Sequence, residues 1–258
     1  MRTLAAQMVM SVAVLLFAAL AVLVARELRG DARRFAYAWA FTGQAFLLEG
    51  ANSLSHDLFS LIGFLGGPDS AAWNAVLRWH PVLNHSRTFL LTTFCVVLAV
   101  ILHRASRGVP PPRPRRALAV VAAGMLVGAL AGWFEPFFTN RTHYSAVAIF
   151  DIMEMLTMMA LLVVGITSSR MDRTLWLALG INAFVVSLSV LLFAAAAQIG
   201  VAGQWTPRPL HVQTAKAAMH GVMVVIAWIY LRRVRRGRPV RGLIESPPAP
   251  ARMSTLHG

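Results

Sequence analysis

Apolar residues gather in seven long segments of the chain, separated by short stretches rich in arginine, proline or glycine. A helix needs about 20 mostly apolar residues to cross a bilayer, and every segment is close to that length. No alternation of polar and apolar positions indicates strands, and backbone within lipid must satisfy its own hydrogen bonds. The pattern predicts an all-α polytopic membrane bundle of seven transmembrane helices, near residues 4–25, 35–58, 82–103, 116–134, 144–168, 174–199 and 210–231.

Composition agrees with a membrane location. The 258 residues are 57% hydrophobic and 13% charged, with a mean hydropathy of +0.63. A soluble domain is about one quarter charged, so this balance excludes a soluble enzyme. The 24 basic residues far outnumber the 10 acidic ones, giving a formal net charge of +14. In a soluble protein such an excess would suggest nucleic acid, so its distribution along the chain decides its meaning.

Most of the positive charge falls on one side of the predicted bundle. Eighteen of the 24 basic residues lie in the first, third and fifth loops and in the C-terminal tail. The positive-inside rule makes that side cytoplasmic, which predicts an external N-terminus, a cytoplasmic C-terminus and no nucleic-acid partner. We expect a multi-pass protein of the cell inner (plasma) membrane.

Two regions follow from this distribution, a transmembrane domain at 1–233 and a tail at 234–258 that is first basic and then disordered. The arginines at the junction of these two regions are expected to contact anionic lipid headgroups. They include Arg232, Arg233, Arg235 and Arg236.

The second loop, at about 59–81, is predicted to be the longest and to break at Gly66-Gly67-Pro68. Beyond the break, a short amphipathic helix is predicted in the headgroup layer, because four large residues recur at helical spacing. They are Trp73, Val76, Leu77 and His80.

The fourth predicted span carries Gly124, Gly128 and Gly132, which form two overlapping small-xxx-small steps on one face. Glycine lets another helix backbone approach closely in a membrane. This face is therefore predicted to make a tight helix contact, either within the bundle or with a partner membrane protein.

Ionisable residues within the predicted spans mark the candidate site, because such groups are costly in lipid and seldom face it. Spans 2, 3, 5 and 7 carry them at similar depth, about 7 to 15 Å below the outer surface or near the midplane at 1.5 Å per residue. We predict a polar cavity in the outer half of the bundle. Its expected ligand-binding residues are Glu49, Asn52, Arg87, Asp151, Glu154 and Lys216. The alternative is a set of structural ion pairs and helix-to-helix hydrogen bonds with no ligand.

Histidines near the same level add the possibility of a transition metal such as zinc, copper or iron. The candidate ligands are His56, His85, Asp151 and His220. No closely spaced pair such as H-x-x-x-H occurs, so the metal signal is not specific. Cys95 is the only cysteine, which excludes both an intrachain disulfide and a cysteine zinc site.

Lys216 lies in the seventh predicted span, where microbial rhodopsins carry the lysine that binds retinal. The chain departs from that family, because Val212 stands where an aspartate is expected and no carboxylate follows Arg87 in Thr88-Phe89-Leu90-Leu91. Retinal is therefore not expected.

Three functions stay open from the sequence. The first is a receptor-like or accessory subunit whose outer cavity binds a small ligand or metal ion. The second is a membrane-embedded metal-dependent enzyme, a hydrolase or oxidoreductase, that uses the same cavity. The third is a proton-coupled transporter, which is disfavoured because the inner half of the bundle holds few ionisable residues.

Overall fold

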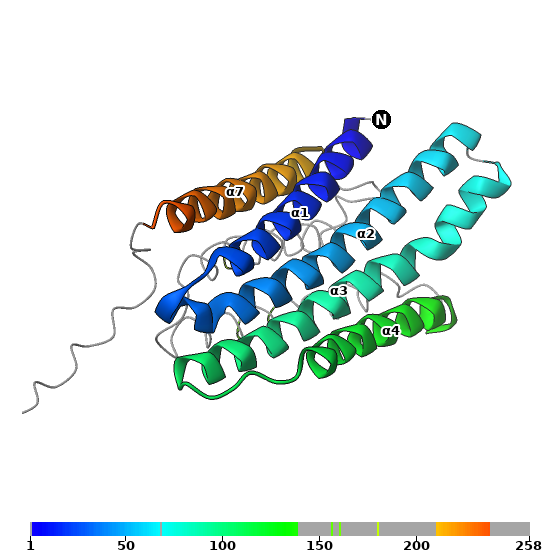
Figure 1. Ribbon diagram of the computed structural model, residues 1–258. Helices are drawn as coiled ribbons and strands as arrows, with labels where there is room; N and C mark the ends of the chain where they lie inside the picture. Colours follow the sequence, from blue (N-terminus) through cyan, green and yellow to red (C-terminus); the bar gives the residue numbers. More distant parts are fainter. Residues whose placement is uncertain are drawn as a thin grey trace, which may run out of the picture.

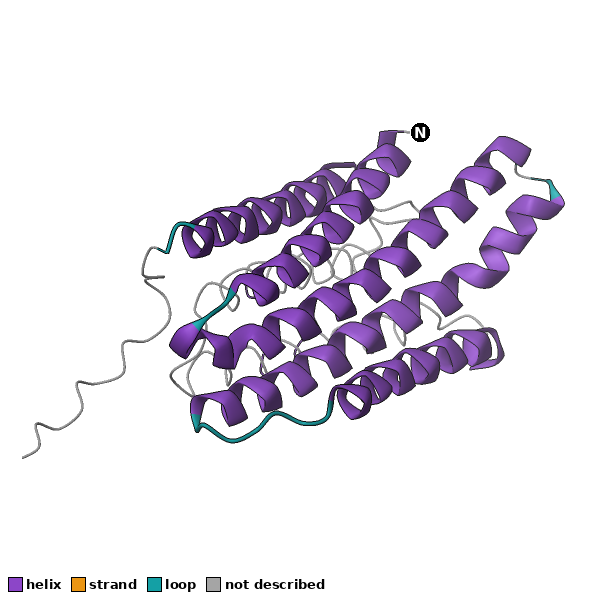
Figure 2. Cartoon of the chain, viewed as in Figure 1, coloured by secondary structure: helices purple, strands orange, loops and turns teal. Residues whose placement is uncertain are grey.

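The computed structural model describes residues 2–67, 69–138 and 210–237, with the single positions 156, 160 and 180. Every regular element among these residues is a helix (Figure 2), so the predicted all-α class is confirmed for this part of the chain. The predicted spans at 144–168 and 174–199 lie outside it, apart from the single positions. So do Asp151, Glu154 and the end of the tail.

Five α-helices and one 3₁₀ helix form the described part (Figure 1). They are α1 (Arg2–Glu27), η1 (Gly30–Phe35), α2 (Ala36–Gly66), α3 (Ala71–Ser106), α4 (Pro114–Phe138) and α7 (Leu210–Arg235). Four contain stretches long and apolar enough to cross a membrane: Leu4–Glu27, Ala71–Ala105, Pro114–Phe134 and Lys216–Arg235. The described chain thus has the helices of a multi-pass membrane protein. Helix α2 is not among the four, because polar residues such as Gln44 and Glu49 lower its hydropathy.

The helices lie side by side in the order α7, α1, α2, α3, α4 (Figure 1). Aromatic contacts join the central three. Phe46 of α2 makes edge-to-face contacts with Phe17 of α1 and Phe94 of α3, at ring-centroid distances of 5.0 and 5.6 Å. Trp39 of α2 stacks on Tyr230 of α7 at 5.1 Å. Helix α2 is therefore the centre of the described bundle.

Helices α2 and α3 form a long hairpin that corrects the prediction for the second loop. Helix α2 continues to Gly66 and α3 begins at Ala71, so the loop is a tight turn, and the separate short helix expected in the headgroup layer is absent from this region. Gly67, at φ 84°, ends α2 in a conformation that favours glycine. The Ser70 hydroxyl then caps α3 by accepting from the Trp73 amide, 3.0 Å away.

The break predicted at Gly66-Gly67 is confirmed, because α2 ends at Gly66. The proline at 81, an ordinary helix-ending signal, is what concealed the continuity of α3. Helix α3 nevertheless continues through Pro81. Its 36 residues correspond to about 54 Å at 1.5 Å per residue, well beyond the roughly 30 Å hydrocarbon core.

The glycine face of α4 packs against α3 of the same chain. A Cβ atom added at Gly128 would lie 2.4 Å from the carbonyl oxygen of His85, and one at Gly132 would lie 2.5 Å from that of Pro81. Both contacts are with backbone, which side-chain rotation does not relieve. The tight helix contact predicted for this face is therefore made within the bundle.

Candidate functional site

Polar pairs join α2 and α3 in one antiparallel register. The Nε atom of Arg87 donates to Oε1 of Glu49 at 2.8 Å, and the rings of His56 and His80 share a hydrogen bond of 2.6 Å. The residue numbers of each pair add up to 136, as an antiparallel hairpin with one register requires. The two pairs are seven residues apart, which is two helical turns, so both lie on the seam where α2 faces α3.

In the Glu49–Arg87 ion pair, the carboxylate is buried and the guanidinium is partly exposed. The Glu49 side chain is 1% exposed, whereas that of Arg87 is 21% exposed. Only Oε1 of Glu49 is bonded, and the second carboxylate oxygen, Oε2, has no hydrogen-bond partner among the described residues. One helical turn farther along α2, the buried hydroxyl of Ser53 also lacks a partner there. Two unsatisfied polar atoms therefore occupy the same face of α2.

A second polar group links α1 to the hairpin. The Ser11 hydroxyl of α1 donates to Oδ2 of Asp57 at 2.6 Å, with both residues buried. On the other side of this carboxylate, Nδ1 of His56 lies 3.7 Å from Oδ1 of Asp57. Because His56 also contacts His80 of α3, a continuous set of polar contacts connects α1, α2 and α3.

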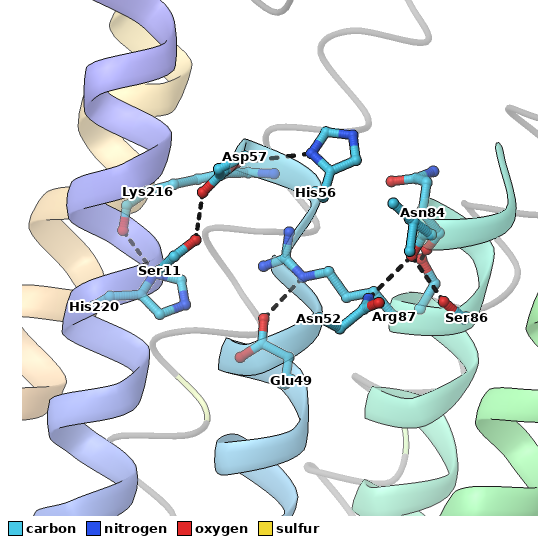
Figure 3. A network of polar contacts seen from close by, with 12 residues as sticks. Ser11, Glu49, Asn52, His56, Asp57, Asn84, Ser86, Arg87, Lys216 and His220 are labelled. Atoms are coloured by element: carbon cyan, nitrogen blue, oxygen red, sulfur yellow. Dashed lines mark hydrogen bonds and ion pairs between the residues drawn. The ribbon is translucent and has the colours of Figure 1, made fainter. Parts of the chain in front are cut away.

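Helix α7 supplies two further buried polar residues, Lys216 and His220, each 2% exposed. Nδ1 of His220 donates to the backbone carbonyl oxygen of Lys216 at 2.7 Å, which fixes the ring along its own helix. Figure 3 shows side chains from α1, α2, α3 and α7 converging on this level of the bundle.

Of the six predicted ligand-binding residues, Glu49 and Arg87 are in direct contact, and Lys216 is buried on α7. Asn52 is also on the hairpin seam, but its amide donates to the Leu83 carbonyl oxygen at 3.1 Å and joins two helices. Asp151 and Glu154 lie outside the described residues.

The predicted metal ligands are not assembled among the described residues, where no group of three or more histidine, cysteine or acidic residues could hold a metal ion. His56 pairs with His80, His85 is buried on the part of α3 that packs against α4, and His220 lies on α7. Asp151 falls outside the described ranges.

Three residues of the site are not among the predicted site residues: Ser11, Asp57 and His80. A lone serine in an apolar helix carries no signal of its own, because serine often bonds to its own backbone there. For His80 a signal existed. Once Glu49 and Arg87 are taken as a pair in an antiparallel hairpin, the same register pairs His56 with His80.

Comparison of the chain with models of protein families, with curated proteins and with solved structures gives no match. The site must therefore be interpreted from its own chemistry.

Proposed function

We propose that this chain is a seven-helix integral membrane protein, with its N-terminus outside, that binds a small polar ligand in the outer half of the bundle. It would act as a receptor-like or accessory subunit. The observation that carries the proposal is the unsatisfied Oε2 atom of Glu49, buried beside the partly exposed Arg87.

The energetic reason is the cost of a buried acceptor without a donor. Leaving such a group unpaired costs about 1 to 3 kcal/mol, and more for a charged group. Native proteins contain few such atoms, and each calls for an explanation such as a catalytic role or a bound water or ion. A ligand with an N–H or O–H group would satisfy Oε2 of Glu49, and Ser53 lies within one turn to contribute a hydroxyl.

The arrangement of the polar residues favours ligand binding over metal-dependent catalysis. The described polar groups contact one another directly, as Glu49 does with Arg87 and His56 with His80. A catalytic metal needs three or more protein ligands converging on one point, and no such group occurs among the described residues.

The proposed orientation gives the basic end of α7 a role at the cytoplasmic surface. Arg232, Arg233, Arg235 and Arg236 are all exposed there, and the Arg232 guanidinium lies 5.7 Å from the Trp228 ring centroid. Tryptophan and arginine are typical of the membrane interface, where arginine attracts anionic lipid headgroups. This end is the proposed contact with such lipids.

Cysteine labelling from outside intact cells tests the ligand site. In a Cys95→Ala background, we expect Ser53→Cys to react with a small membrane-impermeant thiosulfonate, because the proposed site opens outward beside the partly exposed Arg87. Leu47→Cys on the same helix is the matched control. Its position is 55% exposed on the apolar surface of α2, and a thiol in lipid does not ionise and react. Absence of reaction at Ser53→Cys would refute an outward-facing site.

The same background tests orientation. Asp69→Cys, in the exposed turn of the α2–α3 hairpin, should react from outside. Arg107→Cys, at the opposite end of α3, should react only after the cells are permeabilised. The reverse result would overturn the proposed topology and, with it, the outward opening of the site.

A further inference from the structure

We infer that the ligand of this site is a small zwitterion of the amino-acid type, whose carboxylate binds Arg87 and whose ammonium N–H groups bind Oε2 of Glu49. The inference rests on the proposed function, because it names the chemical class of ligand that the same site would accept. Three properties of the ion pair support it.

The first property is the set of donors left on Arg87. A guanidinium has five N–H donors in a rigid planar fork that matches a carboxylate. Only Nε is engaged by a described residue, and it donates to Oε1 of Glu49. The two terminal nitrogens make no hydrogen bond to the described residues, and the side chain is the accessible member of the pair at 21% exposed. Arg87 can therefore donate hydrogen bonds to a planar anionic group of an entering ligand.

The second property is the acceptor left on Glu49. Oε2 is buried with no partner among the described residues, and the Ser53 hydroxyl on the same helical face is in the same condition. An ammonium group has up to three N–H donors and suits two such acceptors. A ligand oxygen without a hydrogen would instead repel the carboxylate.

The third property is charge balance. Among the described residues of the site, the formal charges of the carboxylates Glu49 and Asp57 balance those of Arg87 and Lys216, and Glu49 and Arg87 are in contact at 2.8 Å. An added anion or cation would bring one uncompensated charge into a poorly solvated region, which is strongly unfavourable. A zwitterion adds no net charge and supplies both the acceptor for Arg87 and the donor for Glu49.

The test uses the purified full-length chain in nanodiscs and measures the melting temperature, which rises when a ligand binds the folded state. The probes are the twenty common amino acids. For any that stabilises, three derivatives follow: the N-trimethyl betaine, the amide and the N-acetyl form. They lack the N–H donors, the carboxylate and the ammonium, respectively.

We expect at least one amino acid to stabilise the chain and each derivative to bind about 10- to 150-fold more weakly, the loss of one charged hydrogen bond. Equal binding of the betaine would overturn the role of Glu49. Equal binding of the amide would overturn that of Arg87, and equal binding of the N-acetyl form would overturn the zwitterion requirement.

Variants give an independent readout. Glu49→Gln should reduce the preference for the amino acid over its betaine toward one, whereas Glu27→Gln, which removes an exposed carboxylate paired with Arg235, should leave it unchanged. A preference retained in Glu49→Gln would overturn the inference.

The two proposals fail in different ways. If Ser53→Cys reacts from outside but no amino acid raises the melting temperature, the outward site stands and the zwitterion is wrong. If Ser53→Cys does not react, and no amino acid stabilises the chain, both are wrong.

Discussion

A double-mutant cycle on Glu49 and Arg87 measures how much the buried ion pair contributes to stability. With the two charge centres about 4 Å apart and an effective dielectric constant of about 20, Coulomb's law gives an attraction of about 4 kcal/mol. The 21% exposure of Arg87 screens part of it, so we expect a coupling of about 2 to 4 kcal/mol.

Each single variant should cost about 3 to 5 kcal/mol, because it leaves the other charge buried without its partner. Arg87→Met keeps the apolar stem and removes the charge, and Glu49→Gln keeps the shape of the carboxylate. The double variant should cost less than the sum of the two single variants by this coupling of about 2 to 4 kcal/mol, since its second change removes a charge that has already lost its partner.

The assay is reversible unfolding in mixed micelles with increasing sodium dodecyl sulfate, followed by circular dichroism. The matched control is the Glu27–Arg235 pair, whose side chains are 33% and 49% exposed at 3.1 Å. Its coupling should stay below about 1 kcal/mol. A Glu49–Arg87 coupling below about 0.5 kcal/mol, within the additivity error of distant sites, would refute the account of this pair.

Three further predictions use the same assay. Gly128→Ala should destabilise the bundle by about 1 to 3 kcal/mol, because its methyl group meets the α3 backbone. Gly221→Ala, with no atom within 4 Å of the added methyl, should be neutral or stabilising, and equal effects at the two glycines would contradict the close approach. Ser11→Ala should cost about 1 to 3 kcal/mol, since Asp57 loses a buried donor; an unchanged stability would mean that water replaces the hydroxyl. Lys216→Met should cost about 3 to 5 kcal/mol because it removes a buried charge from a region that holds two carboxylates, and a small effect would place its ammonium in water.

The helical class was predictable because each apolar segment is long enough to cross a bilayer and lipid leaves the backbone few alternatives. The tight glycine contact of α4 was predictable for a similar reason, since small residues at four-residue spacing have one common use in membranes. The length of α2 and α3 was not. Gly66-Gly67 does end α2, but Pro81 looks like a helix end in the sequence, whereas α3 continues through it.

Within the site, the sequence by itself determined which residues are polar at an apolar depth and which face of each helix they share. That is how Glu49, Arg87 and Lys216 were identified. Which side chains pair across two helices depends on how far one helix is shifted along the other. A shift of one helical turn would give Glu49 a different neighbour, although the pattern of polar and apolar residues in each helix would stay the same. Only the tertiary structure decided that Arg87 faces Glu49, that His56 faces His80, and that Ser11 reaches Asp57 from α1. The physical reason is that helix periodicity orients a side chain about its own axis, whereas the partner across the interface is set by how whole helices pack.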